Sequence, residues 1–103
     1  MINTVFRSRL MPGVDAEYGT LATEMSRLAG LMPGFVSEKT FVADDGERVT
    51  IVMFADAASQ QAWRDHPAHR RAQERGRTAL YSEYSVYSAA VTYSASHRGD
   101  AVS

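Results

Sequence analysis

The chain has 103 residues and a mass of 11.3 kDa, which suits one compact domain. Its net charge of -1 argues against a general nucleic-acid binder, whose affinity depends on neutralising phosphates. The absence of cysteine excludes disulfides, thiolate nucleophiles and cysteine-based metal sites. No apolar run is long enough to cross a bilayer and no secretory signal is visible, so we expect a cytoplasmic protein without a membrane partner.

The first third of the chain predicts a strand followed by a helix. Residues 2–10 alternate, and the Pro12-Gly13 pair breaks the run. Asp15 is a candidate N-cap, because its carboxylate can accept the free N–H groups of a first helical turn. An apolar stripe then recurs at spacings of three and four: Tyr18, Leu21, Met25, Leu28 and Met32. Gly30 and Pro33-Gly34 end this helix.

Two further strands are predicted at 35–43 and 48–55, joined by a hairpin at 44–47. The Asp45-Gly46 pair supports this turn, since glycine accepts the positive φ of tight hairpins. Asp56 is the next candidate N-cap and opens a helix through Trp63.

Pro67 interrupts that second helix at His66, because proline disfavours α geometry in the residue before it. A polar helical segment resumes over 68–75, and Gly76 ends it. The last strand is predicted over 80–93, and we expect residues 94–103 to form a flexible tail to a single domain at 1–93.

The order of strand, helix, strand, strand, helix, strand predicts an α+β, ferredoxin-like split β-α-β fold. Its four-stranded antiparallel sheet would carry two helices on one face. The strands nevertheless contain apolar residues on both faces, and such sheets are usually covered on both. We therefore expect the second face to pack on another copy of the chain, giving a homodimer.

Several short motifs carry a family resemblance over residues 2–93. They are Met32-Pro33-Gly34-Phe35, Asp45-Gly46-Glu47, Phe54-Ala55-Asp56, the dense stretch from Trp63 to Gln73, Gly76-Arg77, and finally Tyr81 and Tyr84. With these motifs the chain resembles the antibiotic biosynthesis monooxygenase family of dimeric α+β barrels.

The resemblance implies an oxygenase that needs no flavin, metal or haem. Members with known activity let molecular oxygen react directly with an electron-rich phenol, anthrone or hydroquinone. Such an enzyme requires a base, hydrogen-bond donors for the developing oxyanion, and an apolar slot for the rings. A dimeric barrel that binds a small molecule without turnover is the contrasting hypothesis.

His69, His66 and Trp63 are the candidate catalytic residues. A histidine titrates near neutral pH and can accept a phenolic proton, and Trp63 would form a pocket wall with an N–H donor. Three simpler roles stay open: a cap of the broken helix for His66, partial solvation for His69, and core packing for Trp63. No third ligand accompanies the two histidines, so we expect no metal site.

A second set of residues is predicted to bind the substrate: Asn3, Phe54, Arg77, Tyr81 and Tyr84. The tyrosines, with Tyr87 and Tyr93, would line a slot for rings, although a strand rich in tyrosine is also typical of sheet surface. Arg77 would steady an oxyanion, or interact with a helix dipole.

Haem binding or degradation is the alternative enzymatic hypothesis. Haem-degrading members of the superfamily use an asparagine on the first strand, a tryptophan on the second helix and a histidine further along it. Asn3 and Trp63 match the first two, but Gln73 stands where the histidine would fall.

Overall fold

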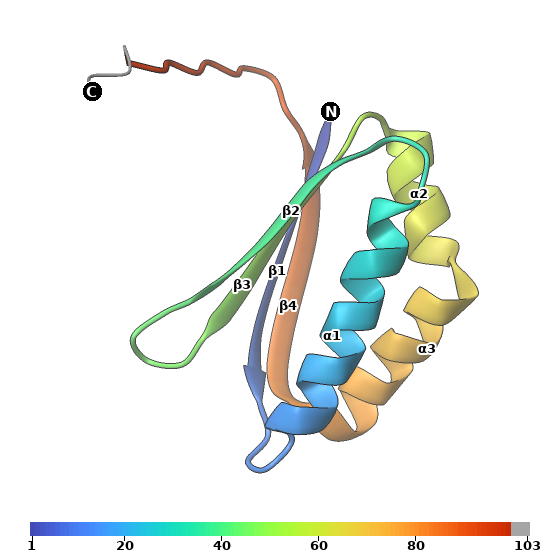
Figure 1. Ribbon diagram of the computed structural model, residues 1–103, viewed down its shortest axis with the longest axis vertical. Helices are drawn as coiled ribbons and strands as arrows, with labels where there is room; N and C mark the ends of the chain where they lie inside the picture. Colours follow the sequence, from blue (N-terminus) through green and yellow to red (C-terminus); the bar gives the residue numbers. More distant parts are fainter. Residues whose placement is uncertain (100–103) are drawn as a thin grey trace.

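The computed structural model describes residues 1–99 and contains one antiparallel sheet with strand order β2-β3-β1-β4. All helices cover the same face of this sheet, and the other face is bare (Figure 1). The elements in chain order are β1 (Ile2–Leu10), α1 (Asp15–Gly30), β2 (Phe35–Val42), β3 (Arg48–Phe54), α2 (Ala57–Asp65), α3 (Pro67–Arg75), the π-helical turn η1 (Gly76–Leu80) and β4 (Tyr81–Ala90).

The predicted ferredoxin-like α+β fold is confirmed, and the strand boundaries agree with the predicted ones to within three residues. The helical layer differs from the prediction of two helices, because the second is divided into α2 and α3 and is followed by η1. His66 has a ψ of 129°, outside the helical range, and Pro67 starts α3 as its first residue. Proline disfavours α geometry in the preceding residue but is well suited to a first helical position.

The two predicted helix caps have different outcomes. Asp56 caps α2 as predicted, and its carboxylate accepts a hydrogen bond of 2.8 Å from the backbone N–H of Ser59. The prediction for Asp15 was wrong, because α1 begins at Asp15 itself and Val14 is the N-cap. The backbone N–H of Tyr18 already bonds to the carbonyl of Val14, so the Asp15 carboxylate acts only through the helix dipole.

Hydrogen bonds identify the side of the sheet that faces the helices. Ser88 of β4 accepts from Gln60 of α2 at 3.2 Å and bonds to Thr4 of β1 at 2.7 Å. Because side chains alternate along a strand, every second residue shares this side with Thr4. The helix-facing residues on the three neighbouring strands include Ile2, Thr4, Phe6, Ser8, Arg48, Thr50, Val52, Phe54, Tyr84, Val86 and Ser88.

The opposite side of the sheet, which we call the open face, is uncovered in the single chain. Its apolar members are Val5, Phe41, Val49, Ile51, Met53 and Tyr87. Phe41 and Tyr87 are about half exposed or more. At one end of this face Arg7 forms an ion pair with Glu47, and Arg9 pairs with Asp45 and Glu83.

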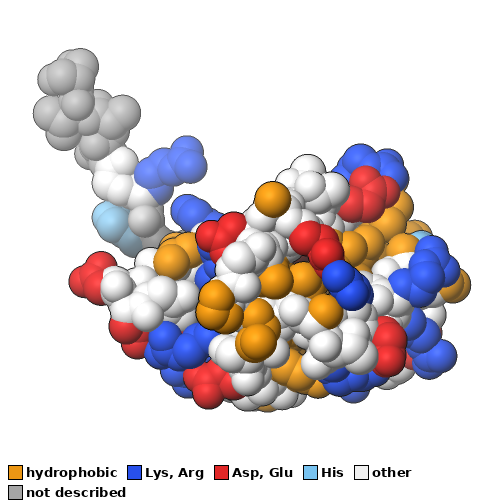
Figure 2. Space-filling view, turned by 90° about the horizontal axis from the view of Figure 1, so that it is seen from below, with side chains coloured by type: hydrophobic (Ala, Val, Ile, Leu, Met, Phe, Trp, Pro, Cys, Tyr) orange, Lys and Arg blue, Asp and Glu red, His pale blue; other side chains and the backbone are white. Residues whose placement is uncertain are grey.

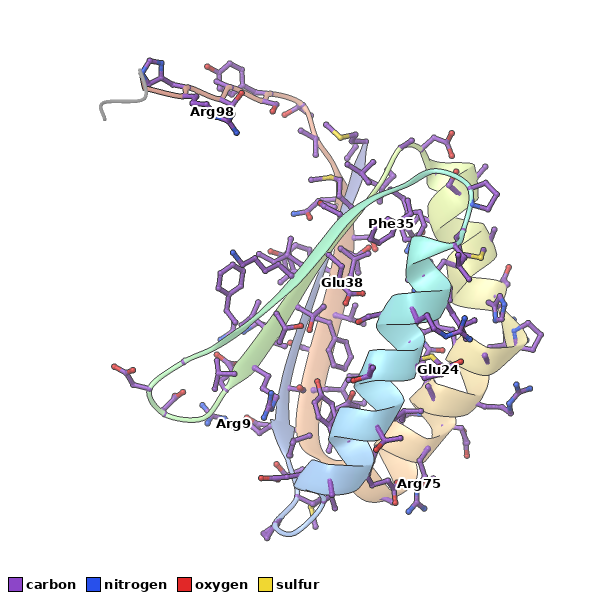
Figure 3. All side chains as sticks on the ribbon, viewed as in Figure 1. Arg9, Glu24, Phe35, Glu38, Arg75 and Arg98 are labelled. Carbon is purple, nitrogen blue, oxygen red and sulfur yellow. The ribbon has the colours of Figure 1, made fainter. Side chains whose placement is uncertain are left out.

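The core lies between the sheet and the helices and is small. Phe54, Trp63 and Ala29 are buried together, and the partly buried Met25 and Leu28 pack against them. Gly34 allows α2 to lie this close, because it has a φ of 84° and any Cβ there would collide with Ser59. In Figure 3, Glu38 lies between β2 and α1, where its carboxylate accepts a hydrogen bond from Ser26.

After β4 the chain leaves the body of the domain as an extended segment over residues 91–99 (Figure 1). Part of the predicted tail, residues 100–103, lies outside the described residues, and the domain limit at residue 93 stays a prediction. Within residues 1–99, no helix combines the length and hydropathy needed to cross a membrane.

Candidate functional site

His69 and Trp63 form a stacked pair across the junction of α2 and α3. Their ring centroids are 4.5 Å apart and their planes differ by 20°. Trp63 is 8% exposed. The Nδ1 atom of His69 is buried and has no hydrogen-bond partner among residues 1–99. An unpartnered buried nitrogen is costly unless a ligand or water satisfies it, so this atom is a candidate proton acceptor.

Burial lowers the pKa of His69 below its ordinary value of 6.5, because a charged imidazole is poorly solvated there. The backbone at Arg64 and Trp63 is near enough to raise the pKa by a smaller amount, although no atom there meets hydrogen-bond geometry with Nδ1, and His66 and Arg64 lower the pKa further. The imidazole is therefore neutral at pH 7. A neutral imidazole is the form that accepts a proton from a substrate.

His66 lies beside Trp63 as well, with ring centroids 5.6 Å apart. Its Nδ1 accepts a hydrogen bond of 3.1 Å from the backbone N–H of Ala68 and so caps α3. The simpler role considered for His66 is therefore the one it has in the structure. The three predicted catalytic residues do lie together, but the Nδ1 atom of His66 already has a structural partner.

An open groove of about 460 Å³ runs between α1 and α3 beside His66. Apolar side chains line it from both helices, and Glu24 and Arg71 stand among them. The lining residues are Leu21, Glu24, Met25, Leu28, His66, Ala68, Arg71 and Ala72. Glu24 is labelled on α1 in Figure 3.

An aromatic cluster occupies the other end of the helix-facing side, where β4 begins. Tyr81 contacts Phe6, Tyr18 and Tyr84, at centroid distances between 5.4 and 6.1 Å. Burial raises the pKa of Tyr81 to about 12, so its hydroxyl stays protonated and can donate a hydrogen bond. In the end-on view of Figure 2, hydrophobic side chains gather in the middle of the surface with charged side chains around them.

The turn η1 places Arg77 next to this cluster. The Arg77 guanidinium donates to Glu74 at 2.7 Å, and its pKa is raised first by Glu74 and then by Tyr84. Gly76 makes the arrangement possible, because a Cβ at this position would run into the ring of Tyr81. Three of the predicted substrate-binding residues are thus neighbours.

Phe54 and Asn3 occupy other environments. Phe54 is 1% exposed and packs edge-on against Phe35, so in this structure it is core. Asn3 precedes Thr4 on β1 and pairs with Met53 and Ala89, which places it on the open face. Its Oδ1 atom is buried without a partner among the described residues.

The position of Asn3 tests the hypothesis that the chain binds or degrades haem. Asn3 and Trp63 lie on opposite sides of the sheet, so the two residues that matched the haem-degrading pattern do not face one site. Gln73 supplies no imidazole at the third position. The residues present therefore do not fit that group. Within residues 1–99, no three His, Cys, Asp or Glu side chains are grouped closely enough to hold a metal ion.

Sequence reasoning missed four side chains on the helix-facing side. Tyr18 lies under the Arg48 guanidinium, 5.1 Å from the ring centroid, and its pKa is raised by burial. Gln60 is a polar residue of α2 with only 9% exposure, and Ser88 joins it to β1. Gln60 precedes Trp63 by three residues, which puts both on one helix face, and that spacing was the available signal.

Comparison with known proteins places these features in a family. The family model described as "Antibiotic biosynthesis monooxygenase" matches residues 1–75. A curated protein of Bacillus subtilis (strain 168), "Uncharacterized protein YqjZ", is 34% identical over 72 residues. That match covers 70% of this chain and 63% of the relative, so the chain spans less than two thirds of its length.

Solved structures show the same fold at low sequence identity. Rv0793 from Mycobacterium tuberculosis superposes with a TM-score of 0.81 at 18% identity, over 92% of this chain and 98% of that one. A putative antibiotic biosynthesis monooxygenase from Deinococcus radiodurans gives 0.84 at 8% identity, over 96% and 100%. SnoaB from Streptomyces nogalater, described as a cofactor-independent oxygenase, gives 0.77 at 16% identity, over 90% and 94%. At such identities the likeness establishes the fold alone.

Proposed function

The chain belongs to the antibiotic biosynthesis monooxygenase family, and on that premise we propose that it is a cofactor-independent monooxygenase of an aromatic, polyketide-like phenol, anthrone or hydroquinone. The observation that carries the proposal is the half-buried His69 imidazole, stacked on Trp63 with a buried and unpartnered Nδ1. SnoaB, which is described as a cofactor-independent oxygenase and has the same fold, supports the same chemistry.

In this mechanism His69 takes the proton of the substrate. The resulting anion is rich enough in electrons to pass one to molecular oxygen, which reacts slowly with closed-shell molecules. For an anthrone, the CH₂ carbon becomes a carbonyl, one oxygen atom enters it and the other leaves as water. The substrate is oxidised and O₂ is reduced, and no further reductant is required.

The other residues of the site have supporting roles. Trp63 forms a wall against the rings and keeps water from the anion. Tyr81 and Tyr84 line the site, and the protonated Tyr81 hydroxyl and the Arg77 guanidinium favour negative charge on the substrate oxygen. His66 fixes the start of α3 and thereby the position of His69.

We also propose that the active protein is a homodimer joined through its open face. Val5, Ile51, Met53 and Tyr87 leave an apolar surface that a second copy would remove from water.

The test is oxygen uptake by the purified protein with anthrones, naphthols and hydroquinones. We expect uptake above the spontaneous rate, lowered about a hundredfold in His69→Gln because general-base catalysis contributes at least this much. His97→Gln is the matched control, since His97 lies in the extended segment after β4.

The outcomes separate the hypotheses. Uptake that is equal in His69→Gln and wild type would keep the oxygenase and remove His69 as its base. No uptake with any compound, together with retention of one of them in native mass spectrometry, would favour a barrel that binds without turnover.

A further inference from the structure

A line of side chains on the helix-facing side follows β4 from one end of the site to the other. We call it the β4 strip and define it by Gln60, Thr4, Ser88, Val86, Phe6 and Tyr84. It is polar at both ends and apolar in the middle. The catalytic assignment above uses only Tyr84 from this set.

The first end of the β4 strip is a chain of three polar groups. Gln60 donates from Nε2 to Ser88 at 3.2 Å, and Ser88 bonds to Thr4 at 2.7 Å. Gln60 is 9% exposed, and the bond to Ser88 is the only one its side chain makes among residues 1–99. A buried amide has two donors and a carbonyl acceptor, so most of its hydrogen-bonding capacity is available to a ligand.

The middle of the β4 strip is apolar and accessible. Phe6 pairs with Val86 across β1 and β4. Val86 lies on the helix-facing side and is still 54% exposed, so no helix covers it. An apolar side chain left open next to a buried polar chain is suited to contact the flat face of a ring.

The second end of the β4 strip is Tyr84, with Arg77 beside it. The Tyr84 ring stacks on Phe6 with centroids 5.6 Å apart, which continues the flat apolar surface. Tyr84 is also 42% exposed, so its hydroxyl and the neighbouring guanidinium can meet a ligand oxygen.

The length of the β4 strip limits what it can bind. Tyr84 and Ser88 are four residues apart on one strand, which corresponds to about 13 Å. A planar aromatic of two or three fused rings spans the apolar middle and brings an oxygen on each outer ring to the two polar ends. A single ring reaches only one end.

We propose that the β4 strip binds a planar fused-ring aromatic with an oxygen substituent on each outer ring, and that Gln60 determines specificity for the oxygen at the buried end. This inference rests on the proposed function, whose substrate it narrows.

Binding is measured through the fluorescence of Trp63, the single tryptophan of the chain, which lies one turn after Gln60. The probes are 2,6-dihydroxyanthraquinone, with an oxygen on each outer ring, and 2-hydroxyanthraquinone, with one. In Gln60→Leu the dissociation constant of the dihydroxy probe should rise roughly threefold to tenfold, as expected for one lost hydrogen bond. The monohydroxy probe can bind in the reversed orientation, with its oxygen at the Tyr84 end. Its dissociation constant should therefore change by less than about twofold.

Two further variants guard against a purely structural effect of the Gln60 substitution. Ser88→Ala removes the partner of Gln60 on β4 and should selectively weaken the binding of the dihydroxy probe in the same way. Ser85 lies on the open face of the same strand, so Ser85→Ala should leave the dissociation constants of both probes unchanged.

The inference is overturned by any of three results: no quenching by either probe, equal affinity in wild type and Gln60→Leu, or equal losses for both probes. Selective loss of the dihydroxy probe without oxygen uptake by any substrate would instead uphold the β4 strip as a binding site and reject the oxygenase.

Discussion

Both faces of the sheet carry apolar residues, but the helices cover only one of them (Figure 1). On the helix-facing side, β1, β3 and β4 contribute four hydroxyl side chains: Thr4, Ser8, Thr50 and Ser88. On the open face the same strands contribute the apolar or aromatic residues Val5, Val49, Ile51, Met53 and Tyr87, together with the polar residues Asn3, Arg7 and Ser85. A sheet with apolar residues on both faces is usually covered on both.

This difference separates two roles. The helix-facing side keeps a small core around Phe54 and Trp63 and leaves polar and aromatic groups available for a ligand. The open face has the composition of an interface, with apolar residues in the middle and ion pairs at one end. Four predictions test this division, in order of decreasing effect.

Phe54→Ala should have the largest effect on stability. Phe54 is buried in the small helix-facing core, and truncating a buried phenylalanine costs about 3–5 kcal/mol in the free energy of unfolding. Urea unfolding measures the loss. Leu31→Ala is the control, because Leu31 is 70% exposed and should change stability by less than about 0.5 kcal/mol. A loss below about 1 kcal/mol for Phe54→Ala would mean that the core lies elsewhere.

Ile51→Asp should dissociate the proposed dimer. A carboxylate in the middle of the open face removes the burial of the isoleucine, which contributes about 2–3 kcal/mol to the free energy of association. It also adds the cost of burying an unpaired charge. Light scattering across a dilution series should show a dimer for wild type and a monomer for the variant. Val42→Asp adds the same charge at an exposed site on the helix-facing side and should stay dimeric. A monomeric wild type would refute the interface.

His69→Gln should remove a pH dependence of stability. The folded-state pKa of His69 lies below the unfolded value of 6.5, so the unfolded chain binds more protons between the two values. Stability is therefore complete above pH 6.5 and falls as the pH drops from there toward the folded pKa. Urea unfolding at pH 8 and pH 5.5 should show a larger loss for wild type than for His69→Gln. Equal losses would show that His69 is not held neutral by burial.

Asp56→Ala should have the smallest effect. The Asp56 carboxylate caps α2, the helix that presents Gln60 and Trp63 to the sheet, and losing such a cap costs about 1 kcal/mol. Asp15→Ala makes the same change at a residue that caps no helix, so it should lower the free energy of unfolding by less. Thermal unfolding of the two variants side by side gives the comparison. A larger loss for Asp15→Ala would contradict the assigned start of α1.

The sequence by itself determined the order of the elements, the hairpin at Gly46, the cap at Asp56 and the break at Pro67. These features depend on local backbone preferences, which a few neighbouring residues decide. Alternation also separated Asn3 from Thr4, because neighbouring side chains on a strand point to opposite faces. The proximity of His66, His69 and Trp63 followed from their short separation along the chain.

Only the tertiary structure decided which face meets the helices. That choice depends on how α2 packs on the sheet. The same packing forms the hydrogen bond from Gln60 to Ser88, 28 residues away in the chain. The same docking of the helices places Asn3 and Trp63 on opposite sides of the sheet and places Tyr18 in contact with Tyr81. The turn η1, which places Arg77 beside Tyr84, was also not predicted. A π-helical turn has no strong local sequence preference from which it could be recognised. Contacts between residues far apart in sequence arise from packing, and packing is a property of the whole fold.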